Sequence, residues 1–215
     1  LDTAEEKIAF LKTELFNEPL DTAAGLFPPR RLALMQGTYP RQRHPTRTTR
    51  YIATLDVAGQ DEATTEGAFT DLVRPARDYT VCTIFEVIPQ TLLAIGPSYH
   101  AVDVFVDHGS RHFQDTPGQP PLFARLLAYL QHWQPIAVIC DASGVGQGLT
   151  DAIIKAFPRQ VIPFDFAKGH NKAQLGNDLL SLVETGRFQY WTGDDDAAWF
   201  VLQCEHCGYD LAEGL

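Results

Sequence analysis

The chain has 215 residues, of which 45% are hydrophobic and 20% charged, so it suits one sizeable globular domain and excludes a disordered or fibrous protein. No apolar run approaches the roughly 20 residues that cross a bilayer, and the N-terminal LDTAEEKIAF is acidic where a signal peptide is basic, so we expect an intracellular protein with no membrane contact. The net charge of −10 argues against DNA binding through overall positive potential, but it leaves room for a local basic surface.

Residues 1–48 are expected to form one helix and a linker. Thr3 and Glu6 have the spacing of a capping box, which predicts a helix over 4–16. Prolines interrupt residues 17–48, for which we expect little regular structure and few core contacts. Between Arg30 and Arg50 the chain carries an acid-free basic strip, composed of Arg30, Arg31, Arg41, Arg43, Arg47 and Arg50. The strip either contacts phosphates or is a solvated linker, and the sequence leaves both interpretations open.

Three strands are predicted next, over 51–57, 79–88 and 99–107, with a long polar loop at 59–78. Because no helix separates them, they should form an antiparallel meander. Asp56 projects from the first strand. Burying a carboxylate is costly unless a cation compensates it, so this residue is either a metal ligand or half of a structural salt bridge.

The stretch PIAVICDASGVGQGLTDAIIKAF, residues 135–157, joins a strand to a helix and follows a helix predicted over 121–133. Its apolar run Ile136–Cys140 is typical of a strand covered on both faces. Asp141 ends that run, at the edge where open α/β sheets bind ligands. A helix N-cap is the competing explanation for this residue. The glycines that follow read GxGxG, which lacks the dinucleotide fingerprint and the Walker lysine.

The remaining pattern predicts a fifth strand over 160–166, a helix over 171–185, a short strand over 187–191 and a last helix that begins at 194–196. Two cysteines near the end, Cys204 and Cys207, form a C-x-x-C with no second ligand pair, which argues against a zinc site.

Cysteines and histidines elsewhere in the chain give weaker signals. Cys82 and Cys140 lie in apolar runs and are expected to be small buried hydrophobes in a reducing compartment. His108 and His112 lie in a predicted loop, where a lone histidine is usually solvated, and neither receives a role.

Taken in order, the elements predict a ribonuclease H-like α/β fold, with a mixed five-stranded sheet in the order 3-2-1-4-5 and helices on both faces. Asp56 and Asp141 would then lie on adjacent parallel strands. Two carboxylates so close repel each other unless a cation neutralises them, so the arrangement predicts a divalent metal, Mg²⁺ or Mn²⁺. The corresponding chemistry is phosphodiester hydrolysis with two ions.

Four segments strengthen this interpretation: YIATLDVAGQDE, RDYTVCTIFEV, ICDASGVGQGL and VIPFDFAKGHNKAQLGNDLLSLVETGRF. They resemble the C-terminal nuclease domain of the large terminase subunit of tailed bacteriophages or prophages, over about residues 50–210. The resemblance matches Asp56 to the first acidic motif, Asp141 to the second, and Asp78 to the acid before the second strand. Lys172 lies in a segment like the family's K-x-x-L-G stretch.

The resemblance implies a metal-dependent endonuclease that cleaves concatemeric double-stranded viral DNA during genome packaging in the host cytoplasm. Its partners would be DNA, an ATPase domain of the same full-length chain, the small terminase subunit and the portal. Residues 1–48 resemble the tail of that ATPase domain and residues 49–215 the nuclease domain. No Walker A motif is present. The implied metal ligands are Asp56, Asp141 and Asp78, and the implied DNA contacts are Lys172, Arg41, Arg43 and Arg47.

One position departs from the family pattern. The third acid belongs to a His-Asp-Asp-like segment, which the sequence does not contain before Leu215; the acids available are Asp194, Asp195, Asp196, Glu205 and Asp210. Asp194–Asp196 are better explained as helix-start residues. Either the third acid lies beyond Leu215 or the site is incomplete, and weak metal binding is expected without it. Two alternatives stay open: another ribonuclease H-like nuclease of integrase or resolvase type, and a non-catalytic nucleotide-binding or assembly module.

Overall fold

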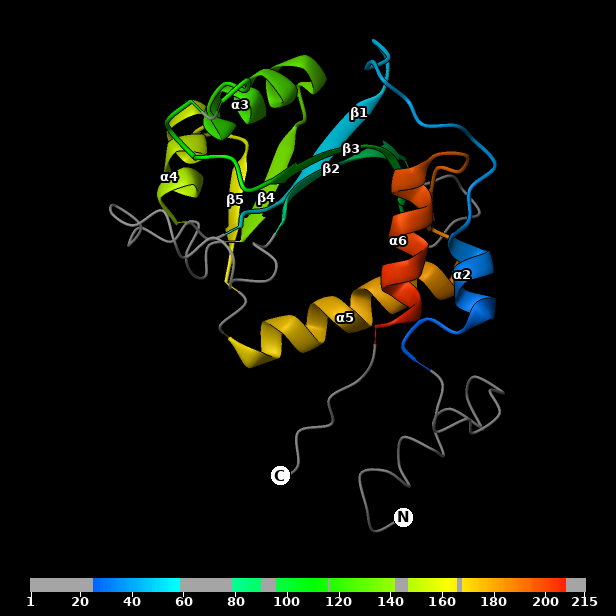
Figure 1. Cartoon of the computed structure of the whole chain (residues 1–215). Coiled ribbons are helices and arrows are strands. Elements are labelled where there is room, and N and C mark those ends of the chain that lie inside the picture. The colour runs from blue at the N-terminus through cyan, green and yellow to red at the C-terminus, as the bar shows by residue number, and fades with distance from the viewer. Residues whose placement is uncertain are drawn as a thin grey trace, which may run out of the picture.

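The computed structural model describes residues 25–58, 79–89, 96–115, 117–141, 147–165 and 168–207 (Figure 1). The helix expected over 4–16 and the polar segment 59–78 lie outside these residues. The elements in chain order are α2 (Pro29–Met35), β1 (Arg50–Asp56), β2 (Tyr79–Ile88), β3 (Ser98–His108), α3 (Leu122–Trp133), β4 (Ala137–Asp141), α4 (Gln147–Ala156), β5 (Val161–Phe164), α5 (Gly169–Glu184), β6 (Phe188–Tyr190) and α6 (Asp195–Glu205).

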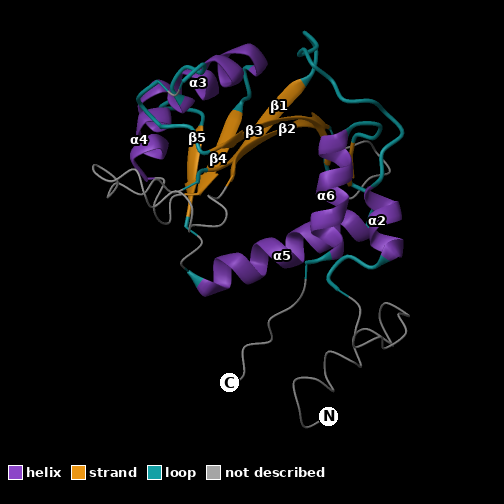
Figure 2. Ribbon diagram, viewed as in Figure 1, coloured by secondary structure: helices purple, strands orange, loops and turns teal. Residues whose placement is uncertain are grey.

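The strands form one mixed sheet, which Figure 2 shows between the helices. Their order in the sheet is β5-β4-β1-β2-β3-β6. β1, β2 and β3 are an antiparallel meander, while β4 and β5 continue the sheet parallel to β1. The predicted order 3-2-1-4-5 is therefore confirmed for five strands. The short strand expected over 187–191 extends it as β6, which pairs parallel to β3. The fold is the predicted ribonuclease H-like fold.

Side-chain alternation along β1 assigns its two faces. Tyr51, Ala53 and Leu55 are at most 3% exposed and pack with the apolar residues of α3 and α4. The opposite face of the sheet, towards β3 and β6, packs against α2, α5 and α6, whose core includes Met35 and Val183. Figure 1 shows these two groups of helices on opposite sides of the sheet. Helices therefore lie on both faces, as predicted, and those of the second group pack over the β3 and β6 side of the sheet.

Helix boundaries follow the chemistry of their end residues. The Asp194 side chain accepts a hydrogen bond from the Ala197 backbone N–H at 3.0 Å and so caps α6, with Asp195 and Asp196 in the first turn. Gly186, just after α5, has φ +66°, a left-handed conformation that glycine adopts at little cost. The helix-start interpretation of Asp194–Asp196 is confirmed.

The prediction that β4 is covered on both faces is wrong. Val138 and Cys140 are fully buried, but Ile139 is only half-buried, and Ile136, just before the strand, is 55% exposed. An apolar run therefore marks this strand, although only one of its faces lies in the closed core.

The prediction of little structure and few core contacts over residues 17–48 is wrong for the described part. Met35 of α2 is 1% exposed. The Gly37 N–H donates to the Tyr190 carbonyl at 2.9 Å, and a Cβ on Gly37 would stand only 2.6 Å from that oxygen. Further along, the Gln42 N–H donates to the Val102 carbonyl at 2.9 Å. This segment covers the edge of β3 beyond β6, where an open edge would expose unpaired backbone groups.

Among the helices of the described ranges, none combines the length and the apolar character that crossing a bilayer requires.

Candidate active site at the carboxyl ends of β1 and β4

Asp56 and Asp141 end two neighbouring parallel strands. The last recorded register pair is Leu55 with Cys140, and each aspartate is the next residue of its strand. Neighbouring strands lie about 4.8 Å apart, and residues in parallel register point to the same face. The two carboxylates are thus brought together on one side of the sheet, as the sequence predicted.

These carboxylates face away from the closed core. Asp56 shares its face with Thr54, and both are exposed, while the alternate residues Ala53 and Leu55 are buried under α3 and α4. Asp141 is half-buried. It also ends β4 six residues before α4 begins at Gln147, so it is not the N-cap of that helix. Asp56 is therefore exposed to solvent and Asp141 is partly exposed.

Two aromatic rings extend the same face beyond Asp56. In the register of β2, Asp56 is opposite Val81, and Tyr79 lies two residues away on the same face. Tyr79 is opposite His108, with ring centroids 4.6 Å apart, and is 48% exposed. The sequence analysis gave neither residue a role. Once the register of β2 with Asp56 is known, the alternation of side chains along β2 and its pairing with β3 locate both residues on this face.

Neighbouring groups support the strand end at Asp141. The Thr150 hydroxyl of α4 is 3.4 Å from the Asp141 carbonyl oxygen, so the helix contacts the strand terminus directly. Cys140 is fully buried, as expected, and burial raises the pKa of its thiol to about 12. A thiol held neutral in this way is a packing group and no competitor for a hard cation.

The donor set fits a hard divalent cation that substrate completes. Within the described ranges no three or more His, Cys, Asp or Glu side chains are grouped so that they could hold a metal by themselves. Mg²⁺, however, is usually bound through one or two carboxylates together with substrate phosphates. Two adjacent carboxylates on a solvent-facing edge match that mode. The third implied ligand, Asp78, lies outside the described residues.

The basic strip is divided by the fold. Arg41 lies at the centre of an ion-pair network with Asp103 (2.5 Å), Asp194 (3.3 Å) and Asp196, and its side chain is only 11% exposed. Its guanidinium also lies over the Trp191 ring. Arg41 therefore holds the linker to the domain, which neither the phosphate-contact nor the solvated-linker interpretation anticipated.

Arg43 and Arg47 are exposed, but they precede β1. The six residue steps from Arg50 to Asp56 span about 20 Å, so these arginines lie at the opposite end of β1 from the carboxylates. Lys172 belongs to α5, which begins five residues after the end of β5. Since Phe164 of β5 is opposite Asp141, the chain leaves β5 towards α5 at the sheet edge where the acids lie.

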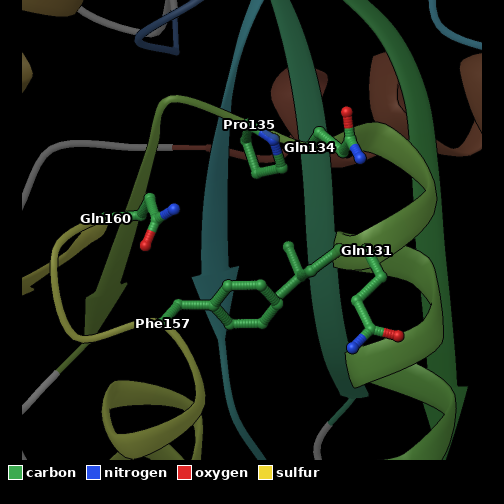
Figure 3. A pocket seen from close by; sticks show the side chains of 6 residues that line it. Gln131, Gln134, Pro135, Phe157 and Gln160 are labelled. Atoms are coloured by element: carbon green, nitrogen blue, oxygen red, sulfur yellow. The ribbon is translucent and has the colours of Figure 1, made fainter.

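A hollow of about 290 Å³ lies between α3 and α4 and is not part of this site. Its lining includes Gln134, Pro135, Phe157 and Gln160 (Figure 3). Pro135 lies before the start of β4, whereas Asp141 ends that strand. The hollow therefore opens at the end of β4 remote from the carboxylates.

The C-x-x-C pair at the end of α6 holds free cysteines. Cys204 is buried and Cys207 half-buried, and burial raises the pKa of Cys204 to about 11. The described residues around this pair form no metal-binding group.

Comparison with known proteins gives a likeness in structure alone. No protein-family model and no curated protein sequence matches the chain. Among solved structures, the large terminase nuclease from thermophilic phage G20c with bound magnesium aligns over 80% of this chain and 76% of its own, at 17% identity and a TM-score of 0.54.

Two further structures agree. The zinc-bound form of the same G20c nuclease aligns over 82% of this chain and 86% of its own, at 17% identity and a TM-score of 0.52. The large terminase nuclease domain of Thermus phage P74-26 aligns over 89% and 83%, at 15% identity and a TM-score of 0.53. At this identity the likeness shows that the chain has the fold of these nuclease domains.

Proposed function

We propose that this chain is the nuclease domain of a large terminase subunit and that it hydrolyses phosphodiester bonds of double-stranded DNA. The observation that carries the proposal is the placement of Asp56 and Asp141 at the carboxyl ends of adjacent parallel strands, on the solvent-facing side of a ribonuclease H-like sheet. The likeness to terminase nuclease structures supports the same conclusion at the level of the fold.

In this proposal Asp56 and Asp141 are the catalytic metal ligands, and Asp78 assists them. Two Mg²⁺ or Mn²⁺ ions, when bound, supply an activated water at neutral pH and stabilise the leaving oxygen. The carboxylates orient that site, and their exposed side of the sheet leaves room for the phosphate of the substrate. Tyr79 and His108 border the same face and would lie beside the nucleotides at the cleaved bond.

DNA contact is assigned to Lys172 of α5, which follows β5, and to Arg43 and Arg47 at the far end of β1 from the acids. A separation of about 20 Å corresponds to roughly six phosphates along one strand at 3.4 Å per step. Arg43 lies beside α3, with its carbonyl 3.1 Å from His132 Nε2, so these arginines would contact DNA at the end of β1 and not on the carboxylate face itself. Arg41 acts by fixing the segment that carries Arg43. Phosphate contacts position DNA without reading bases, so little sequence preference is expected.

The biological role in this proposal is the cutting of concatemeric viral DNA during packaging, in the cytoplasm of the host bacterium. Residues 49–215 would be the nuclease domain and residues 1–48 the connection from an ATPase domain of the same full-length chain. The part of the connection from Gly25 onward packs on the sheet edge and α6, so it would move with the nuclease. The small terminase subunit and the portal are the proposed assembly partners.

The test is cleavage of supercoiled plasmid by the full-length protein with Mn²⁺ or Mg²⁺. Asp56→Asn and Asp141→Asn keep the side-chain size and remove a ligand charge, so each should abolish nicking and linearisation while the protein stays folded. Asp195→Asn, at an exposed aspartate of α6, is the matched control and should cut at the wild-type rate. Wild-type cutting by either Asp56→Asn or Asp141→Asn would exclude the two-aspartate site.

Two rival functions have separate readouts. A resolvase would prefer branched DNA over linear duplex, which a panel of four-way junctions and linear DNA measures directly. A nucleotide-binding module would bind nucleotide equally well in wild type and Asp56→Asn and would not cut DNA with any divalent cation. The proposal expects cutting of linear duplex without a preference for junctions.

A further inference from the structure

The backbone just beyond Asp56 is held from two sides at Ala58. The Ala58 N–H donates to the Thr80 hydroxyl at 3.0 Å, and the Ala58 carbonyl lies 3.2 Å from His112 Nε2. A carbonyl only accepts, so this nitrogen of His112 carries the proton. Thr80 is 1% exposed and His112 is 6% exposed. Two buried polar side chains therefore converge on one residue, two positions from a proposed metal ligand.

Both side chains come from fixed parts of the fold. Thr80 lies inside β2, opposite Asp107 of β3. The His112 carbonyl accepts from the Phe123 N–H at 3.0 Å, which ties it to the first turn of α3. The preceding loop is fixed by Asp107, which accepts from the Ser110 hydroxyl at 2.7 Å and from Arg125 at 2.5 Å.

This arrangement controls how the chain leaves β1. Asp56 is the last residue of β1 in the ladder with β2, so beyond it no strand pairing fixes the backbone. The contacts at Ala58, two residues later, hold the backbone there instead. Burying a polar group costs free energy unless it is hydrogen-bonded. An apolar side chain at position 80 or 112 could pack without that cost, so the hydrogen bonds of Thr80 and His112 to Ala58 are the feature that packing alone does not explain.

We infer that Thr80 and His112 are positioning residues that hold Asp56 in the orientation needed to bind metal. The inference rests on the proposed function, because it assigns these residues a role towards a ligand of that site. Small displacements of a reacting or ligating group lower rates strongly, and changes behind a metal ligand typically cost about 10- to 100-fold in metal affinity or activity.

The test compares Thr80→Val and His112→Leu, which remove the contacts, with Thr80→Ser and His112→Gln, which keep a hydroxyl and an N–H donor. Removal should raise the Mn²⁺ concentration for half-maximal cleavage by about 10- to 100-fold with little change in KM for DNA. Thr80→Ser and His112→Gln should need a Mn²⁺ concentration close to that of the wild type. In metal-free protein, Thr80→Val should also speed hydrogen exchange of the Ala58 amide.

Tyr129→Phe is the matched control for a purely structural effect. It removes a partly buried hydrogen bond of 2.9 Å to Asp103, away from the carboxylate edge, and should lower stability without changing the Mn²⁺ dependence. If Thr80→Val and His112→Leu behave like Tyr129→Phe, the positioning role is excluded. Two independent positions keep the test valid should one variant fail to fold.

A second readout separates this inference from the proposed function. Mn²⁺ broadens the NMR signals of nearby amides, so titration of the Asp56 and Asp141 amides measures binding without cleavage. Wild-type protein that binds Mn²⁺ but does not cut would contradict the proposed function, and weaker binding by Thr80→Val would still support the positioning role. Equal binding by wild type and both removal variants would overturn the positioning role alone.

Discussion

Asp103 and the two strand-end aspartates of this sheet differ in their burial. Asp103, on β3, is 5% exposed and is compensated by Arg41, by the Tyr129 hydroxyl at 2.9 Å and by the Trp133 indole N–H at 3.1 Å. Asp56 and Asp141 lie at strand ends, where Asp56 is exposed. Asp103 joins the linker to the domain. Asp56 and Asp141 are the pair for which we propose a metal site that substrate completes.

Removing Arg41 should have the largest effect on stability. Arg41→Ala would leave the buried Asp103 carboxylate with only the exposed Arg43 guanidinium, 3.9 Å away, and breaking a buried pair from one side typically costs about 3–5 kcal/mol. Arg47→Ala, at an exposed position of the same strip, should change the free energy of unfolding by less than about 0.5 kcal/mol. Urea denaturation measures both. A loss as small in Arg41→Ala as in Arg47→Ala would show that the network does not hold the linker.

Acid should destabilise the protein through His112 and His100. Burial lowers the pKa of His112, opposed by the Ala58 carbonyl and Asp107, and burial lowers that of His100, opposed by Glu86. Below pH 6.5, the ordinary pKa of histidine, these two side chains therefore bind protons in the unfolded chain that they do not bind in the folded chain. Stability should fall as the pH drops below about 6.5 and level off below the folded-state pKa values.

Denaturation of wild type and His112→Gln across this pH range measures the effect. His112→Gln should show a shallower fall, because one of the two groups is gone. A steeper loss of stability with falling pH in His112→Gln would contradict this origin of the acid sensitivity. So would a loss equal to that of the wild type in a variant that lacks both His112 and His100.

The smallest effect on stability is expected at the carboxylate edge. In metal-free protein Asp56→Asn and Asp141→Asn should leave the free energy of unfolding unchanged or slightly increased, because each removes repulsion between neighbouring carboxylates. Thermal unfolding without divalent ions tests this. Destabilisation comparable to that of Arg41→Ala would mean that these aspartates are structural, like Asp103.

The acids could be predicted from the sequence because local rules determine their positions. Strand alternation and the right-handed crossover suffice to bring Asp56 and Asp141 onto adjacent strands. The partners of Arg41 could not be predicted in this way, since Asp103 and Asp196 are 62 and 155 residues away in the chain. The contact between His112 and Ala58 likewise spans 54 residues, and nothing in the loop sequence distinguishes that histidine from a solvated one.

The arginine strip also depends on contacts that are distant in the sequence. Its composition indicates a basic, proline-interrupted linker, but burial of one arginine depends on tertiary contacts that no local pattern records. The exposed face of β4 was missed for a related reason: an apolar run does not say whether a helix covers each side of the strand.

The central claim is that Asp56 and Asp141 together hold a divalent cation. Its most direct test is anomalous diffraction from crystals of the protein soaked in a high concentration of Mn²⁺. We expect a peak between the two carboxylates, within the roughly 2.0–2.2 Å ligand distance of a small hard cation from at least one oxygen of each. Anomalous density elsewhere in the protein, with none between Asp56 and Asp141, would contradict the claim.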